Sequence, residues 1–175
     1  MRTLLLASLM VAVLAFGVAA VTTDDATSSF DVGNNEIAVL DVDGTAGNLL
    51  LVAPTTGGDN PAAVSDDTTY LQYTVVVISA ATKKITAQIT AGSLPAGTLL
   101  KATTAPAGSQ GTLQADVSVT GDAADILTLI PSCATGVGEA DGAKVTWVLS
   151  VSDITSMVST AAASITITYI LTDTG

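Results

Sequence analysis

The stretch of sequence that decides the fold is Ser164-Ile165-Thr166-Ile167-Thr168-Tyr169-Ile170-Leu171. Alternate residues of an extended chain point to opposite faces. Ile165, Ile167, Tyr169 and Leu171 therefore share one face, and the serine, the threonines and Ile170 share the other. β-Branched and aromatic residues suit a pleated strand with one buried face. The stretch predicts an antiparallel strand that packs one side on a hydrophobic core.

The same alternation recurs along the chain and indicates the number of strands. It is strong in Leu71–Val77, Lys84–Thr90, Leu113–Val119 and Val145–Val151. Weaker strand candidates are Ile37–Val42, Asn48–Ala53, Thr98–Thr104 and Asp125–Ile130. Turns rich in Gly and Pro separate these segments, and Ile154–Ala163 alone favours a turn of helix. About nine short strands predict an all-β fold, an immunoglobulin-like antiparallel β-sandwich.

The composition excludes most catalytic and nucleic-acid-binding classes. The 175 residues include 16 Asp and Glu but 5 Lys and Arg, so the net charge is -11. There is no histidine and one cysteine, which excludes imidazole bases, histidine triads and His/Cys zinc sites. Nucleic acids and anionic membrane surfaces require clustered lysines and arginines. We therefore expect no enzymatic activity, no cofactor and no nucleic-acid partner.

The N-terminus has the features of a secretory signal peptide. Arg2 precedes an uncharged apolar run from Leu4 to Phe16, and Val18-Ala19-Ala20 places small residues at a cleavage site. The alternative is a membrane anchor, but the run is shorter than the roughly 20 apolar residues that span a bilayer. We expect residues 1–20 to be removed. The mature chain is then secreted, extracellular or at the cell surface, and not inserted in the membrane.

Acidic turns are the best candidates for a metal or catalytic site. Asp41-Val42-Asp43-Gly44 begins like a calcium loop, but the following positions hold threonine, alanine and apolar residues instead of further ligands. Asp66-Asp67 and Asp122 with Asp125 suggest paired carboxylates, yet glycosidases normally grip sugars with aromatics, and aromatics are 3% of this chain. We interpret all of them as solvated turns. The sequence predicts neither a metal site nor a catalytic residue.

The single cysteine and the single tryptophan are both expected to serve packing. Cys133 has no partner for an intrachain disulfide, which leaves burial or an intermolecular bridge, and burial is the favoured alternative. Trp147 lies on the inward phase of its strand, where a sandwich core takes a large aromatic.

Four segments carry a resemblance to a known class of proteins. They are Lys84–Ile89, Leu94–Leu100, Asp125-Ile126 and Ser164–Asp173. Together they resemble small secreted prokaryotic immunoglobulin-like proteins of the pilus-subunit and surface-fibre kind. The chain lacks the early cysteine pair and the C-terminal strand glycine of chaperone-usher pilins, so the resemblance is to donor-strand fibres of another kind. The resemblance implies self-association into a homopolymer, in which an N-terminal extension of one subunit fills a groove in the next.

The composition independently favours a fibre. Small side chains and few aromatics suit a packing unit better than a recognition surface, which normally displays Tyr, Trp and Arg. Val76, Val148 and Ile170 are apolar at outward positions, where a neighbouring subunit would cover them. We expect a structural subunit of an extracellular filament or pilus. The alternative is a non-polymerising cell-surface adhesin or carbohydrate-binding module.

The most specific prediction concerns the N-terminal extension, residues 21–43, which precedes a β-sandwich domain at 44–175. Its polar start, Thr22–Ser29, has the composition of a flexible leader. Apolar or small residues follow in one phase, and these form the candidate donor strand: Phe30, Val32, Ala38, Leu40 and Val42. Such a strand could complete a neighbour's sheet. The alternative, at even odds, is that it forms the first strand of its own sandwich.

Overall fold

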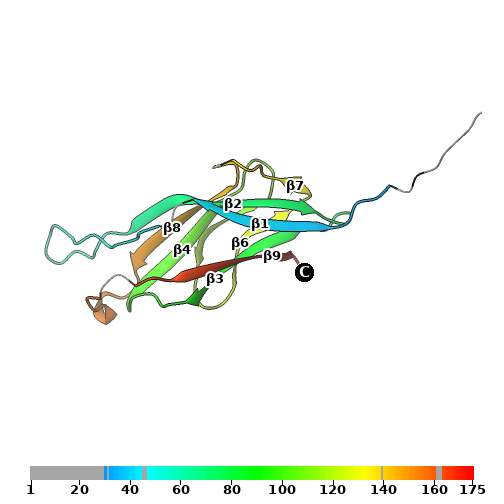
Figure 1. Ribbon diagram of the computed structural model, residues 1–175. Helices are drawn as coiled ribbons and strands as arrows, with labels where there is room; N and C mark the ends of the chain where they lie inside the picture. The colour runs from blue at the N-terminus through cyan, green and yellow to red at the C-terminus, as the bar shows by residue number, and fades with distance from the viewer. Residues whose placement is uncertain (1–29, 31, 45–46, 139, 161–162) are drawn as a thin grey trace, which may run out of the picture. The chain divides into compact units, whose positions relative to one another are not determined.

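The computed structural model describes residues 30, 32–44, 47–138, 140–160 and 163–175. The expected signal peptide at 1–20 and the start of the extension at 21–29 lie outside the described residues. The chain divides into two units, Met1–Gly33 and Asn34–Gly175. The second unit holds the strands (Figure 1), whereas only Phe30, Val32 and Gly33 of the first are described.

The described residues form nine strands and one 3-10 turn. The elements are β1 (Ile37–Gly44), β2 (Val64–Val76), β3 (Lys83–Ala91), β4 (Thr98–Ala105), β5 (Thr112–Ser118), β6 (Ala124–Ile130), β7 (Cys133–Ala134), β8 (Ala143–Val151), the 3-10 turn η1 (Ile154–Ser156) and β9 (Thr166–Asp173). The expected all-β class is confirmed.

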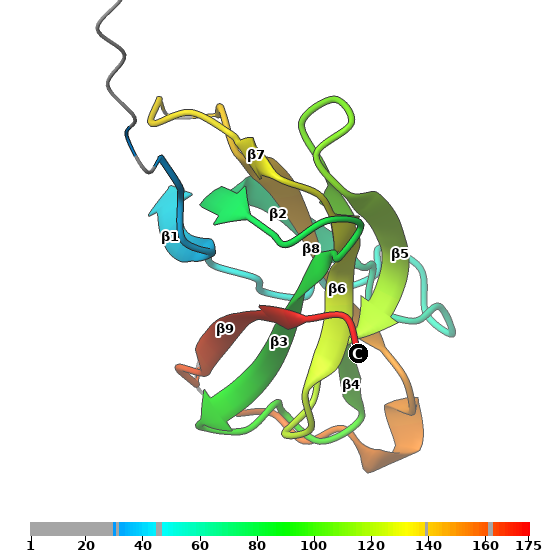
Figure 2. The same ribbon diagram turned by 90° about the vertical axis from the view of Figure 1, so that its right-hand side faces the viewer.

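The strands form a single antiparallel sheet that rolls up on itself. Its order is β1-β2-β8-β4-β5-β6-β3-β9, and β7 pairs with β2 beside this path. Figure 2 shows β1 and β9, the two ends of the path, on the same side of the molecule, with the other strands curling between them. The sheet is therefore nearly closed and barrel-like, which is not clearly the immunoglobulin-like sandwich expected from the sequence.

Strand β5 joins strands that would otherwise form two separate sheets. It pairs with β4 through Lys101 and Ser118, and with β6 through Leu113 and Leu127. A register shift in β4 and a positive φ of 54° at Asp116 bend β5 between these partners. One strand thus joins the strands that would otherwise lie in opposite layers.

The structure differs from the expected elements at three places. Residues 48–53 form no strand, and Val52 makes an isolated bridge with Ala62. Of the helical turn expected at 154–163, the described residues show only η1, because the chain is extended again at Met157. The two-residue strand β7 was not predicted, since a strand of this length has no alternation to detect.

The core lies inside the rolled sheet and contains the inward phase of the alternating strands. Trp147 is 5% exposed there, as the sequence predicts. The buried apolar side chains are Leu71, Tyr73, Val75, Ile85, Ala87, Leu100, Ala102, Val119, Ile126, Leu127, Ile130, Ala143, Val145, Trp147 and Leu149. The large side chains come mainly from β2, β3, β4, β6 and β8, while β1 contributes none of them.

Candidate subunit interface

Strand β1 is an edge strand of its own barrel. All eight of its residues pair antiparallel with β2, from Ile37 opposite Val76 to Gly44 opposite Thr69. In this structure β1 therefore takes the second of the two arrangements that the sequence left open, in which it is the first strand of its own fold. The pairing within one chain does not test whether the same segment is also exchanged between chains.

The candidate donor residues are held weakly by the core. Phe30 and Val32, which precede β1, are 81% and 96% exposed. Within β1, Ala38 and Val42 are exposed, and Leu40 alone packs partly buried against the core. The opposite phase of the strand is no better buried, since the Val39 side chain is 58% exposed. Two faces with exposed apolar residues are unusual for a strand that serves only its own subunit.

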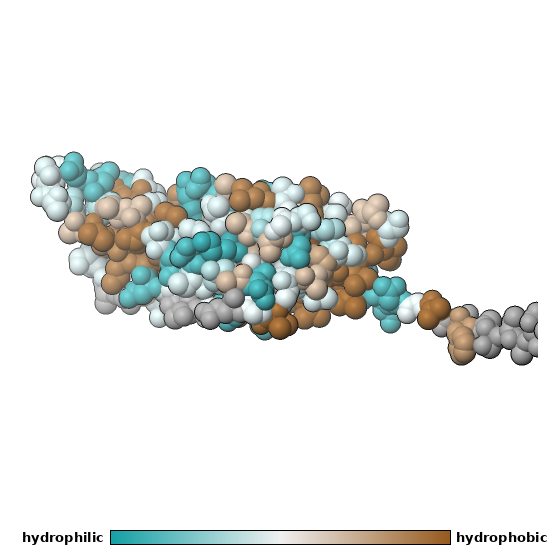
Figure 3. Space-filling view, turned by 90° about the horizontal axis from the view of Figure 1, so that it is seen from above, coloured by the Kyte–Doolittle hydropathy of each residue, from teal (hydrophilic) through white to brown (hydrophobic). Residues whose placement is uncertain are grey.

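Other apolar residues that the sequence places on the outside are covered to different degrees. Ile170 in β9 is exposed, whereas Val76 and Val148 are partly buried. Apolar side chains appear as several patches between polar ones in the space-filling view from above (Figure 3).

An apolar groove of about 760 Å³ lies at the open seam of the barrel. One wall is the end of β1 with residues 47–51, and the other is residues 157–160 and 163–165 with the start of β9. The floor consists of core side chains from β4 and β8, among them Leu100, Trp147 and Leu149. Asp43 is the one acidic or basic residue among the described lining residues. The groove is therefore suited to apolar side chains and not to a charged ligand.

An aromatic pair stiffens the floor of this groove. The ring centroids of Trp147 and Tyr169 lie 6.4 Å apart, and the planes are tilted by 59°. Such tilted pairs are favourable beyond the area that they bury. Burial raises the pKa of the Tyr169 hydroxyl to about 12, so this residue stays neutral at physiological pH.

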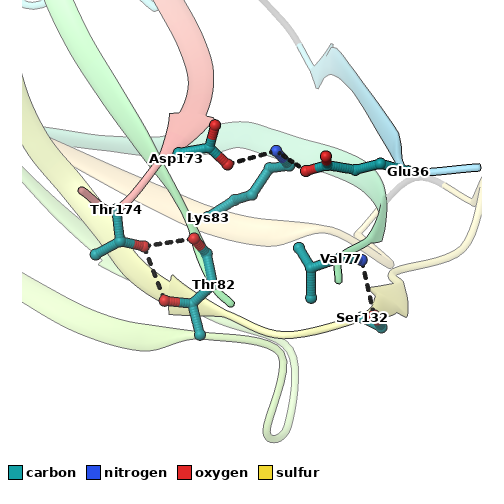
Figure 4. Close-up of polar contacts among 7 residues, drawn as sticks. All are labelled: Glu36, Val77, Thr82, Lys83, Ser132, Asp173 and Thr174. Carbon is teal, nitrogen blue, oxygen red and sulfur yellow. Dashed lines mark hydrogen bonds and ion pairs between the residues drawn. The ribbon is translucent and has the colours of Figure 1, made fainter. Parts of the chain in front are cut away.

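The other end of β1 is fastened by a buried lysine. The Lys83 Nζ atom lies 2.6 Å from Oε1 of Glu36 and 2.7 Å from Oδ1 of Asp173 (Figure 4). The two carboxylates, Asp173 first and then Glu36, raise the pKa of the Lys83 ammonium. Lys83 thus joins the residue before β1 to the end of β9.

Hydrogen bonds secure the chain end beside this lysine. The Thr174 hydroxyl donates to the Thr82 carbonyl at 2.7 Å, and the Val77 N–H donates to the Ser132 hydroxyl at 3.0 Å (Figure 4). The ion pairs of Lys83 with Glu36 and Asp173 were not predicted from the sequence. The available signal was the position of Lys83, which shares the inward phase of Ile85 and Ala87.

The acidic turns are bonded to their own neighbourhoods. Oδ1 of Asp41 and Oδ1 of Asp43 each accept the backbone N–H of the next residue at 2.8 Å. The Asp43 Oδ2 atom also accepts a hydrogen bond from Gln72 Nε2. No group of three or more potential metal-ligating His, Cys, Asp or Glu side chains occurs in the described part of the chain.

The carboxylates of Asp66, Asp67 and Asp125 are bonded to lysines or to a local turn, and Asp122 makes a hydrogen bond through its backbone. Asp67 lies 2.9 Å from Lys144, which lowers the pKa of the Asp67 carboxyl, and Asp125 lies 3.1 Å from Lys84. Asp66 accepts hydrogen bonds from the Thr68 backbone and hydroxyl, within the bulge of β2. Asp122 donates its backbone N–H to the hydroxyl of Thr120 in the turn before β6.

Cys133 is half-buried in β7, opposite Val75 of β2. Burial raises the pKa of the Cys133 thiol, which disfavours the reactive thiolate.

Comparison with protein-family models, curated proteins and solved structures gave no match. Among the described residues, no helix has the length and apolar character needed to cross a membrane. The groove, the edge strand and the exposed residues before it are therefore the features of the molecule that bear on its function.

Proposed function

We propose that this chain is a structural subunit of an extracellular filament or pilus, which polymerises non-covalently by β-strand donation between subunits. It acts as a secreted homopolymer at the cell surface and contributes to cell adhesion through the fibre. Its barrel is a variant of the immunoglobulin-like sandwich, in which β5 bridges the β1-β2-β8-β4 layer and the β6-β3-β9 layer.

The observation that carries this proposal is the poor burial of the N-terminal segment. The side chains of Phe30 and Val32 are exposed, and the edge strand β1 also exposes apolar side chains such as Val39 and Val42. An edge strand offers unpaired backbone groups to another chain, and exposed apolar residues add affinity when that chain covers them. A monomer gains nothing from this arrangement, because exposed apolar edges promote unspecific aggregation.

The alternative function, a non-polymerising adhesin or carbohydrate-binding module, has less support, because Phe30 is the one strongly exposed aromatic side chain among the described residues. Sugar recognition uses aromatic rings that face the solvent. Trp147 is buried, and Tyr169 is partly buried against it at the bottom of the groove. A soluble monomer that bound a glycan array would favour this alternative.

The test is electron microscopy of the mature protein, together with a chain that begins at Gly44. The mature protein is expected to form filaments, and the shortened chain is expected to be monomeric or unstable. A synthetic peptide of residues Ser28–Asp43 should rescue the shortened chain. Normal filaments from the shortened chain would overturn strand donation by this segment.

A further inference from the structure

We infer that the apolar groove binds a neutral single-chain amphiphile, which is a hydrocarbon chain with an uncharged headgroup of hydroxyl or ester oxygens. The groove lies wholly within the Asn34–Gly175 unit. The inference goes beyond the proposed function, because it concerns a small-molecule ligand and does not depend on assembly.

The groove has the position and the size of a small-molecule site. The ends of β1 and β8 and the starts of β4 and β9 border it, which places it at one mouth of the barrel. Barrel mouths are common places for ligand sites, and the volume of the groove falls within the roughly 300–1,000 Å³ of such sites. Leu50 on one wall and Val158 on the other have exposed side chains that a ligand would cover.

The backbone of the groove's floor is already hydrogen-bonded within the sheet. Trp147 and Leu149 belong to β8, and each of them pairs with a residue of β2 on one side and a residue of β4 on the other. The Leu100 carbonyl in β4 accepts the Val119 N–H at 3.0 Å. A peptide laid on this floor would bury backbone N–H and C=O groups without partners beneath it. A hydrocarbon chain has no such groups, so the floor favours a hydrocarbon.

The charges around the groove disfavour an ionic headgroup. Among the described lining residues there is no lysine or arginine, so a carboxylate or phosphate head would have no cation to pair with. Asp43, the one acidic residue of the described lining, already accepts hydrogen bonds at both carboxylate oxygens, from the Gly44 N–H and from Gln72 Nε2. A cationic head would have to compete with these donors. Since burying an unpaired charge is costly, the headgroup that fits is uncharged.

Uncharged polar side chains border the apolar floor. Asn48 lies on one wall and Ser159, Thr160 and Ser164 lie on the other, and all four residues are exposed. Their amide and hydroxyl groups can donate hydrogen bonds to, and accept them from, the hydroxyl and ester oxygens of a ligand. A buried apolar floor and an exposed neutral polar rim thus match the two parts of a neutral amphiphile.

The test compares two ligands that have the same hydrocarbon chain and different heads. The mature protein is titrated with glycerol monododecanoate and with ionised dodecanoate, both below the concentrations at which they form micelles. Binding is followed by calorimetry and by the emission of Trp147, the one tryptophan of the chain, which lies on the floor of the groove. We expect the glycerol ester to bind in a ratio of one molecule per chain and to change the Trp147 emission. Dodecanoate should bind at least about tenfold more weakly.

Two variants place a charge on opposite walls of the groove. Leu50→Asp and Val158→Asp change side chains that are 56% and 63% exposed, so folding is preserved. The matched controls are Val52→Asp and Ile154→Asp, whose side chains are 57% and 47% exposed and lie outside the groove lining. Each wall variant should weaken binding of the glycerol ester at least about tenfold, and each control should leave it unchanged.

Three results would overturn the inference. The first is that the glycerol ester does not bind. The second is equal binding by the wall variants and the controls, which would indicate unspecific adsorption to exposed apolar surface. The third is dodecanoate binding as tight as that of the glycerol ester. If a second copy of the chain covers the groove instead, the ester does not bind, and light scattering shows that the wall variants lose self-association while the controls keep it.

Electron microscopy of the same samples separates this inference from the proposed function. Binding that the wall variants lose, in a protein that forms no filaments, would sink the filament function alone. Filaments from a protein that does not bind the glycerol ester would sink the ligand site alone.

Discussion

Substitution of two leucines on the paired strands β1 and β2 tests how strongly β1 is packed in its own barrel. Leu71 of β2 is completely buried, whereas Leu40 of β1 is partly buried at the open seam. We predict that Leu71→Ala lowers the free energy of unfolding far more than Leu40→Ala. The comparison is matched, because both substitutions delete the same three carbon atoms from paired strands.

The magnitudes follow from burial. Deleting three buried carbons loses about 2.4 kcal/mol of transfer free energy at about 0.8 kcal/mol each. The closed cavity at Leu71 raises the loss to roughly 3–5 kcal/mol. Leu40 leaves no closed cavity and is partly solvated already, so its loss is roughly 1–1.5 kcal/mol. The difference is therefore at least roughly 1.5 kcal/mol, which corresponds to at least about a tenfold change in the unfolding constant.

Urea denaturation followed by the fluorescence of Trp147 measures both losses. The measurements are made in the Phe30→Ser/Val32→Ser background, so that assembly does not contribute to apparent stability. The m-value must stay constant for the comparison to report stability. If Leu40→Ala destabilises the protein as much as Leu71→Ala, then β1 is an integral part of the core and our description of it as a weakly held edge is refuted.

Three further predictions concern side chains away from β1. The Thr104 hydroxyl is buried and has no hydrogen-bond partner among the described residues, so Thr104→Val should raise the free energy of unfolding by about 1 kcal/mol, and calorimetry showing a loss would contradict this. Cys133→Ser should leave filaments intact in micrographs, and a thiol reagent should react slowly at pH 7 because burial raises the pKa of Cys133; filaments that dissolve in reductant would contradict this. Hydrogen bonds from the hydroxyls of η1 lower the pKa of Asp153, so its stabilisation is present above about pH 4 and is lost as the pH falls through the lowered pKa. Asp153→Asn should therefore flatten the acid limb of a stability-against-pH curve, and an unchanged limb would show that the cap contributes nothing.

The sequence predicts the strands because their cause is local. Alternation in Leu71–Val77 and Val145–Val151 arises from the pleat itself, and both segments bury the phase that was expected. Closure of the barrel has no such local signal. It depends on a register shift between β4 and β5 and on the positive φ of Asp116, an aspartate that looks like any exposed strand residue.

One wall of the groove is formed by a segment that was expected to be a strand. Residues 49–53 are all apolar and do not alternate with polar residues, which is compatible with a buried strand. The structure instead leaves Leu50 exposed and places residues 47–51 along the groove. A single sequence cannot show what would cover such a segment, because the cover comes from residues far away in the chain.

The ion pairs of Lys83 favour one of two forms of strand donation, which differ in whether β1 leaves its own barrel. If all residues to Val42 left the barrel, the ion pair between Glu36 and Lys83 would break, and a buried ammonium would lose one of its two carboxylates. If the donated part ends before Glu36, the pair stays intact and β1 keeps its hydrogen bonds to β2. The second form loses fewer contacts, and it donates Phe30 and Val32, whose side chains are 81% and 96% exposed. A chain anchored at Glu36 and free before it can thus bind its neighbour without unfolding its own edge.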